Sequence, residues 1–261
     1  MTTLLQLEKV TVKFGGLVAL HEIDLTLNQG EVLALIGPNG AGKTTLFNLL
    51  TGIYRPTTGS IYYKGEVINK LQPFERVKKG IARTFQNTRL IQGMTVLENV
   101  LIAHRQCNTE GLLSSIFLTK KGRDRREAAT QECIGILALV GLEHKVDELA
   151  GGLPYGEQRL LEIARALVSK CEVLLLDEPA AGMNAIEKKQ LVEKIRHLSK
   201  EFGIEIILIE HDMGLIMDIS DKIVVLDHGI KIAEGTPAEI QQNPQVISAY
   251  LGGEDDLFEW E

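Results

Sequence analysis

Residues 32–50 carry the feature that most limits how this chain can fold. Five consecutive apolar residues, 32–36, precede a glycine-rich octet, and a stretch with helical character follows over residues 42–50. A continuous apolar run of this length is typical of a strand buried on both faces. We therefore expect a strand, a tight loop and a helix in direct succession.

The octet matches the phosphate-loop pattern G-x-x-x-x-G-K-[ST] in full, in the strand-loop-helix context that its chemistry requires. Glycines allow backbone N–H groups to turn toward phosphates, and the helix N-terminus adds a partial positive charge. We expect Lys43 to reach the β and γ phosphates of ATP, Thr44 to ligate Mg²⁺ and Thr45 to add a phosphate contact. The glycine spacing disfavours a dinucleotide site. The predicted nucleotide ligands of this loop are Gly37, Pro38, Asn39, Gly40, Ala41, Gly42, Lys43, Thr44 and Thr45.

Two adjacent acids follow another buried-strand pattern at residues 173–176. The carboxyl end of this strand is expected at the same sheet edge as the phosphate loop. We expect Asp177 to hold Mg²⁺ through water, and Glu178 to act as the general base that activates the attacking water.

Buried-strand patterns also occur at residues 205–209 and 222–226, with amphipathic stretches near 185–202 and 213–219. This alternation predicts an α/β fold with a mainly parallel sheet covered by helices. Short β-prone runs separated by turn signals, over residues 4–36 and 61–68, instead predict an antiparallel β region.

An insertion separates the phosphate loop from the acid pair. Residues 52–172 are several times longer than one crossover needs. Helical apolar spacing at 96–104 and 127–141 predicts a helical subdomain. Between these helices we expect a solvated loop, and contact with lipid head groups or a membrane partner is the alternative. That loop contains a basic cluster of Lys120, Lys121, Arg123, Arg125 and Arg126.

Charge and composition exclude several classes of protein. The hydrophobic fraction of 44% is ordinary for a globular chain. Five of the seven net negative charges lie in the tail at residues 252–261, which leaves −2 for the other 251 residues. A body so close to neutral disfavours nucleic-acid binding driven by bulk charge.

The sequence also predicts where the protein resides. The first nine residues lack a secretory signal, and every apolar run is far shorter than the roughly 20 residues that span a bilayer. The three cysteines, Cys107, Cys133 and Cys171, have no disulfide or C-x-x-C spacing, and the histidines show no zinc spacing. These patterns favour a cytosolic protein that does not cross the membrane itself.

From about residue 4 to 251 the chain resembles the ATP-binding subunit of an ABC transporter. Beyond the phosphate loop and the acid pair, the resemblance includes Gln86 in Arg83-Thr-Phe-Gln86 and His211 in Ile209-Glu-His-Asp212. It implies that Gln86 touches Mg²⁺ and senses a membrane partner, and that His211 contacts the γ-phosphate. Phe14 is placed where the family has an aromatic ring against adenine.

The signature segment of this family, commonly Leu-Ser-Gly-Gly-Gln, is Leu153-Pro-Tyr-Gly-Glu157 here. Leu153 and Gly156 are kept as predicted nucleotide contacts, whereas Pro154 removes both a hydroxyl and an N–H donor. A helix start remains at this point and can bind an anion. Glu157 is unfavourable near phosphates unless it faces away or a base such as Arg159 screens it.

Asn184 stands where an aspartate commonly ends the segment after the acid pair, and it can still cap the following helix. These departures, with the 14–20 and 249–252 segments, resemble the ATPases of importers for branched-chain or hydrophobic amino acids. The resemblance implies one ABC ATPase domain over residues 1–251. Its P-loop NTPase (RecA-like) core with the β subdomain would cover about 1–90 and 165–251, and the helical subdomain about 91–164.

The same resemblance implies cofactors and partners. ATP and Mg²⁺ would bind between the phosphate loop of one subunit and residues 153–157 of another, in a homo- or heterodimer. Integral membrane permease subunits and a solute-binding protein complete such an importer, which places this chain peripherally on the cytoplasmic side of the inner membrane. Three alternatives stay open: an ABC ATPase for another solute, a soluble ABC ATPase of translation or DNA repair, and a small-molecule kinase.

Overall fold

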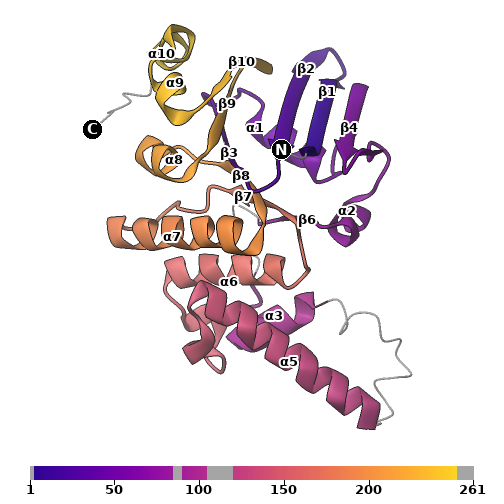
Figure 1. The fold of residues 1–261 in the computed structure, drawn as a ribbon, viewed down its shortest axis with the longest axis vertical. Helices are drawn as coiled ribbons and strands as arrows, with labels where there is room; N and C mark the ends of the chain where they lie inside the picture. The colour runs from indigo at the N-terminus through magenta and orange to yellow at the C-terminus, as the bar shows by residue number, and fades with distance from the viewer. Residues whose placement is uncertain (1–2, 85–89, 105–119, 252–261) are drawn as a thin grey trace.

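A six-stranded sheet forms the centre of the computed structural model, which describes residues 3–84, 90–104 and 120–251 (Figure 1). The strand order is β10-β9-β3-β8-β7-β6, and only β10 is antiparallel to its neighbour. This arrangement confirms the mainly parallel sheet. The strands are β3 (Val32–Ile36), β6 (Ile81–Arg83), β7 (Val173–Asp177), β8 (Glu205–Ile209), β9 (Lys222–Asp227) and β10 (Ile230–Gly235).

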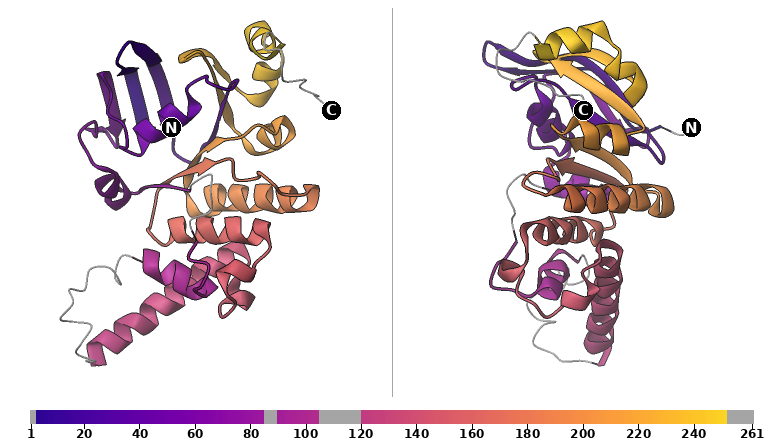
Figure 2. Two further views of the ribbon diagram at one scale, coloured as in Figure 1. Left: turned by 180° about the vertical axis from the view of Figure 1, so that it is seen from behind. Right: turned by 90° about the vertical axis from the view of Figure 1, so that its left-hand side faces the viewer.

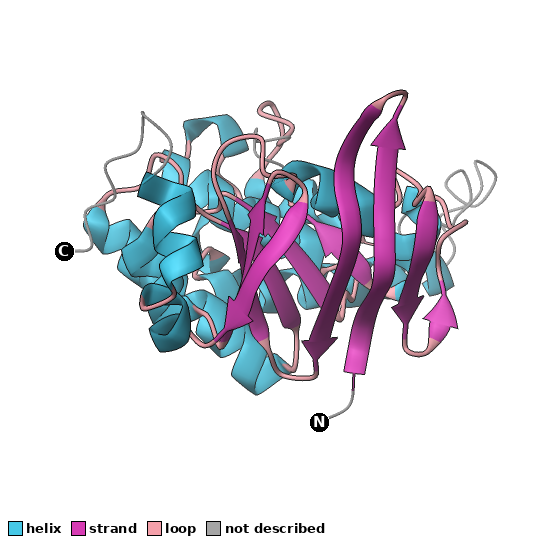
Figure 3. Cartoon of the chain, turned by 90° about the horizontal axis from the view of Figure 1, so that it is seen from above, coloured by secondary structure: helices cyan, strands magenta, loops and turns pink. Residues whose placement is uncertain are grey.

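A second sheet, of order β2-β1-β4-β5, is entirely antiparallel (Figure 3). Its antiparallel character is as predicted, but the expected short runs are wrong. The first two strands have 12 residues each and accommodate their twist through several register shifts. The strands of this sheet are β1 (Thr3–Phe14), β2 (Leu17–Asn28), β4 (Thr58–Tyr63) and β5 (Glu66–Val67).

Both faces of the central sheet are buried, which explains the continuous apolar strands. Leu33 and Leu35 of β3 belong to a core that includes Phe47 of helix α1 (Lys43–Leu50) and residues of β1 and β2. The alternate residues of β3, among them Ala34, face a second and larger core with α7 (Ala185–Phe202) and α8 (Met213–Ile219). The phosphate-loop helix is thus held between two sheets.

The inserted region is helical, as predicted (Figure 2). Helices α3, α5 and α6 pack on one another, and α5 extends away from both sheets. Because α5 begins at Lys120, the basic cluster lies in its first two turns and not in a loop. The elements here are α3 (Val96–Ala103), α5 (Lys120–Val140), α6 (Tyr155–Leu167) and the 3-10 turns η1 (Glu143–Lys145) and η2 (Ala150–Gly152).

The described part of the chain also contains the short helices α2 (Pro73–Lys79), α9 (Pro237–Gln241) and α10 (Pro244–Leu251). Arg76 of α2 is buried and donates to the carbonyls of Leu49 and Leu50 at the end of α1. Burial lowers the pKa of this guanidinium to about 10. Across the three described ranges, none of the helices combines the length and apolar character that bilayer crossing requires.

Candidate functional site

The phosphate loop lies at the carboxyl end of β3, where three glycines, Gly37, Gly40 and Gly42, have backbone angles that side chains disfavour. Gly37 has φ 147° and Gly42 has φ 103°. A Cβ on Gly37 would lie 2.0 Å from the Leu226 carbonyl oxygen of β9, so only glycine fits between loop and strand. Packing against β9 therefore fixes the start of the loop.

Lys43 is the first residue of α1, and its side chain folds back into the loop. Its Nζ donates to the carbonyl oxygens of Gly37 at 2.5 Å and Pro38 at 3.1 Å. The residue is only 8% exposed. The loop thus curls around an ammonium group, which is the placement expected of a group that contacts phosphates.

A hollow of about 540 Å³ opens beside this loop. Glu178 at the end of β7 and His211 after β8 line it together with the loop, although the three lie far apart in the sequence. Predicted ligands that line the hollow are Asn39, Gly40, Ala41, Gly42, Lys43, Thr44 and Thr45. The predicted residues that do not line it are Phe14, Gly37, Pro38, Leu153, Gly156 and Asp177.

Glu178 and His211 contact each other directly. The Oε1 atom of Glu178 lies 3.0 Å from Nε2 of His211. Glu178 has φ 48°, a left-handed conformation that is uncommon outside glycine and clusters at functional sites. Its N–H donates to Ile209 at the end of β8, so the turn after β7 is tied to the neighbouring strand. This geometry joins the predicted base and the predicted switch histidine into one unit.

Glu210, which the sequence analysis did not single out, lies beneath this pair. It is 5% exposed, and its carboxylate accepts hydrogen bonds from the backbone N–H groups of Ala180 (2.7 Å) and His211 (3.0 Å). Burial raises the pKa of Glu210 above its usual value, against the lowering effect of these two donors. Its position before His211 was the only available signal in the sequence.

Asp177 ends β7 and is buried beside the hollow. Its Oδ2 atom accepts a 2.5 Å hydrogen bond from Arg83 of β6, whose other terminal nitrogen donates to Asn48 of α1 at 2.6 Å. Arg83 also lies over the ring of Phe47. Sequence reasoning missed this arginine, which links the predicted metal ligand to the phosphate-loop helix.

The signature segment begins α6, as its sequence predicts. Leu153 is buried, and Pro154 takes the N-cap position. The charge of Glu157 is balanced by Lys145 of η1, which donates at 2.7 and 2.9 Å. The sequence suggested Arg159 for this role, but that guanidinium is buried between the Tyr155 hydroxyl and Glu162.

The signature segment also packs on the segment after the acid pair. A Cβ on Gly182 would lie 3.2 Å from the Tyr155 ring, and one on Gly156 would lie 3.0 Å from the Glu187 carboxylate. Asn184 caps α7, as predicted, by accepting from the N–H groups of residues 186 and 187. These contacts make one surface from residues 153–157 and 180–187.

Of the two remaining predicted residues, Phe14 and Gln86, only Phe14 lies within the described part of the chain. Phe14 is 44% exposed, and its ring packs edge-on against Tyr54 with a centroid distance of 4.9 Å. It ends β1 close in sequence to residues 17–19, which line the hollow. Gln86 lies outside the described residues. A smaller cavity, of about 270 Å³, is lined by Val77, Ala82, Arg83, Thr84, Ala103, Glu162, Arg165, Ala166 and Ser169.

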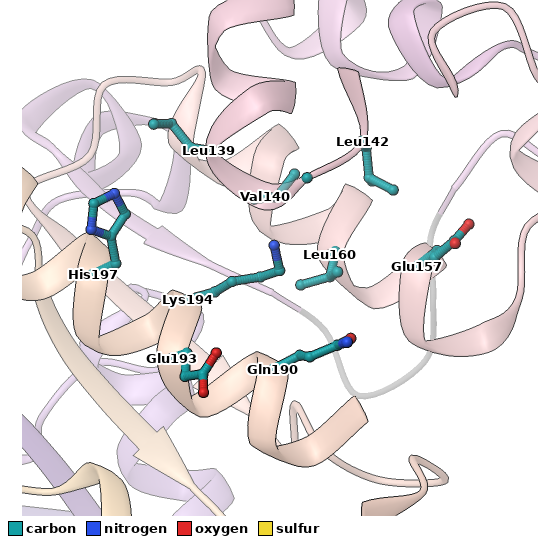
Figure 4. A pocket seen from close by; sticks show the side chains of 10 residues that line it. Leu139, Val140, Leu142, Glu157, Leu160, Gln190, Glu193, Lys194 and His197 are labelled. Carbon is teal, nitrogen blue, oxygen red and sulfur yellow. The ribbon is translucent and has the colours of Figure 1, made fainter. Parts of the chain in front are cut away.

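A further hollow, of about 570 Å³, lies between α7, the C-terminal end of α5 and the first turns of α6 (Figure 4). Lys194 of α7 reaches across it toward Gly141, where an added Cβ would lie 2.8 Å from its Nζ. None of the predicted nucleotide ligands lines this hollow. In the parts of the chain that the structure describes, no cluster of three or more His, Cys, Asp or Glu residues could hold a metal ion.

Comparison with known proteins identifies the family. The ABC transporter family model matches residues 20–181, and the model for the branched-chain amino acid ATP-binding cassette transporter matches residues 231–256. The high-affinity branched-chain amino acid transport ATP-binding protein BraF of Pseudomonas aeruginosa is 46% identical over 95% of this chain and 98% of its own length.

Solved structures agree with this match. A crystal structure of the ADP conformation of an ABC transporter cassette is 32% identical, covers 97% of this chain and 100% of its own, and has a TM-score of 0.83. A dimeric post-hydrolysis cassette bound to ADP and Pi is 25% identical over 89% of this chain and 98% of its own, with a TM-score of 0.70. The chain therefore belongs to the ABC transporter family, as one of its ATP-binding and ATP-hydrolysing cassettes.

Proposed function

We propose that this chain is the ATPase subunit of an importer for branched-chain or other hydrophobic amino acids. The observation that carries the proposal is the hollow where the phosphate loop, Glu178 and His211 meet. The identity with BraF and the family match at residues 231–256 support the choice of solute class.

In the proposed reaction, the loop residues hold the phosphates of ATP and Lys43 balances the charge of the β and γ groups. Glu178 takes a proton from the attacking water, since its carboxylate lies at the hollow beside the loop. His211 contacts the γ-phosphate and, through its 3.0 Å contact, holds the Glu178 carboxylate in place. The side chains that line the hollow thus supply charge balance, a base and orientation.

Mg²⁺ is the metal that fits the residues at this edge. Thr44 lines the hollow with a hydroxyl, and Asp177 offers a carboxylate directly before Glu178, which also lines it. Mg²⁺ is usually bound through one or two such oxygens plus substrate phosphates, so a dedicated protein cage is not needed. We propose Thr44 and Asp177 as its protein contacts, with Gln86 as a third. Bound there, the ion would neutralise charge on the phosphates.

A second cassette would complete each site. Residues 153–157 begin α6, whose N–H groups can bind the phosphates of ATP held by a partner subunit. Phe14 would contact the adenine. Leu149, Tyr155 and Ile186 are 55%, 43% and 72% exposed, and they provide apolar area for such a dimer.

Integral membrane permease subunits and a solute-binding protein would complete the importer on the cytoplasmic side of the inner membrane. We place the permease contact at the cavity of about 270 Å³, because Val77 of α2 lines it and is exposed, as is Phe74 of the same helix. The domain bounds given above, with the helical subdomain at about 91–164, belong to the same proposal.

The test is to purify the chain from its native membranes and identify the bound proteins. A permease that co-purifies, with ATP-dependent uptake of leucine, isoleucine or valine into vesicles, would support the proposal. Uptake of an unrelated solute would support the alternative ABC system, and no permease would favour a soluble ABC ATPase. ATP turnover that requires an added acceptor would favour the kinase.

A further inference from the structure

Two segments, residues 178–180 and 210–211, form a closed ring of contacts. Glu178 reaches His211 through its side chain, and His211 connects through its backbone N–H to the carboxylate of Glu210. The same carboxylate accepts from Ala180, two residues after Glu178. Glu210 therefore joins both ends of the catalytic pair from below.

A carboxylate suits this position for a chemical reason. Two N–H donors point at Glu210, one at each oxygen. An ionised carboxylate offers two acceptor oxygens, whereas an amide offers one acceptor and presents N–H donors at the other position. A glutamine here would leave one backbone N–H facing another donor inside a buried site.

The burial of this group costs stability, which argues against packing as its sole role. Glu210 follows a strand whose five residues are all buried, and it is itself 5% exposed. Charged groups in such positions are generally no more stabilising than apolar residues of similar size. The raised pKa of Glu210 agrees with that cost. The contribution of Glu210 therefore lies in fixing the backbone positions of Ala180 and His211.

Asp212, on the other side of His211, is anchored to the segment that contains Ala180, residues 180–188. Asp212 accepts a 2.5 Å hydrogen bond from Lys188 of α7 and caps α8 through the N–H of Leu215. Glu210 and Asp212 thus fasten the backbone on both sides of His211 to residues 180–188. Because Asp212 and Lys188 are about one third exposed, the buried contact of Glu210 is the less easily replaced of the two.

We propose that Glu210 is a positioning residue for ATP hydrolysis: it holds the turn after Glu178 and the backbone of His211 so that their side chains meet. The proposal rests on the proposed function of Glu178 as base and His211 as its partner. Glu210 itself does not touch the nucleotide and acts through these two residues.

The test compares Glu210→Gln with Glu205→Gln in the full chain. Glu205 begins β8 and Glu210 directly follows it; both are nearly inaccessible, and both accept from backbone N–H groups, Glu205 from Gly30. Only Glu210 adjoins the catalytic pair. We expect kcat for ATP to fall by about tenfold in Glu210→Gln, which corresponds to roughly 1.4 kcal/mol of barrier. KM and nucleotide affinity should stay within about twofold, and Glu205→Gln should keep the wild-type kcat.

A wild-type kcat in Glu210→Gln would overturn the proposal, as would an equal loss of kcat in both variants, which would indicate a general structural effect. If Glu210→Gln does not fold, Glu210→Asp carries the test, since its shorter carboxylate cannot reach both donors; an unchanged kcat there would also overturn it. Glu178→Gln is measured in parallel. If that variant hydrolyses ATP normally, the base assignment has failed, and a loss confined to Glu178→Gln means that only the role of Glu210 is wrong.

Discussion

Arg83 donates a 2.5 Å hydrogen bond to Asp177, and both side chains are less than 10% exposed. The pair joins β6 to the end of β7, and Arg83 also donates to Asn48 of α1, the phosphate-loop helix. A buried carboxylate that loses its counter-ion is strongly destabilised, whereas an exposed ion pair contributes little.

We therefore expect Arg83→Met to lower the free energy of unfolding by about 3–5 kcal/mol. Urea unfolding, followed by circular dichroism, measures this change. Lys79→Met is the matched control, because Lys79 pairs with the exposed Glu66 at the same 2.5 Å distance. The Lys79→Met substitution should leave the urea concentration at the unfolding midpoint unchanged. Equal effects in the two variants would show that burial of the Arg83–Asp177 pair is unimportant.

Glu178→Gln should bind ATP and lose most of its turnover. The amide retains the shape of the side chain but cannot take a proton from water. Trapped between binding and hydrolysis, this variant should also accumulate as a closed dimer with ATP. Steady-state phosphate release and size-exclusion chromatography measure the two effects. Hydrolysis at a near wild-type rate would remove Glu178 from the base role.

Lys43→Ala should lose nucleotide binding, turnover or both. The ammonium group lies inside the loop on the carbonyls of Gly37 and Pro38, and its loss removes the positive charge that faces the phosphates. Isothermal titration with ATP, together with turnover, tests this. If affinity and turnover were both undiminished, the phosphate loop would be misassigned.

The ion pair of Glu132 on α5 with Lys170 should make stability depend on pH. The hydrogen bond from Lys170 holds the pKa of Glu132 below its usual 4.5. A lowered folded-state pKa gives a contribution that is complete above the unfolded value of 4.5 and is lost as the pH falls through the lower folded value.

Glu132→Gln should consequently be less stable than the wild type at pH 6 to 7, and the difference should shrink below about pH 4.5. Thermal unfolding at a series of pH values measures it. Glu127→Gln, an exposed position on the same helix, is the control and should show no such trend. A constant difference at every pH would contradict the assigned pairing.

Local sequence was sufficient to predict the elements that carry the chemistry. The strand, loop and helix at residues 32–50 were predictable because burial on both faces and the glycine spacing leave few alternatives. Asp177 and Glu178 were found because they follow the buried-strand pattern at residues 173–176, whereas His211 was found through the family resemblance. Asn184 was placed as a cap by its residue type alone.

Long-range pairings could not be predicted. Glu157 lies two residues before Arg159 on the same helix, yet its charge is balanced by Lys145 of a separate turn. Arg159 pairs instead with Glu162. Arg83 owes its role to Asp177 on the neighbouring strand β7 and to Asn48 of α1. Glu210 owes its role to Ala180 in the turn after β7 as well as to His211. Spacing along the chain does not reveal these distant neighbours. The antiparallel β region was predicted, but the 12-residue length of β1 and β2 was not, because register shifts interrupt their alternation.

The contact between Gly182 and Tyr155 has a consequence for an assembled pair of cassettes. In the dimer that we propose, residues 153–157 serve the partner's ATP, while residues 180–187 continue from the chain's own base. Because these segments touch, a shift caused by hydrolysis at one site would be transmitted through a single protein body to the other. Hydrolysis at one of the two sites would therefore change the rate of hydrolysis at the other.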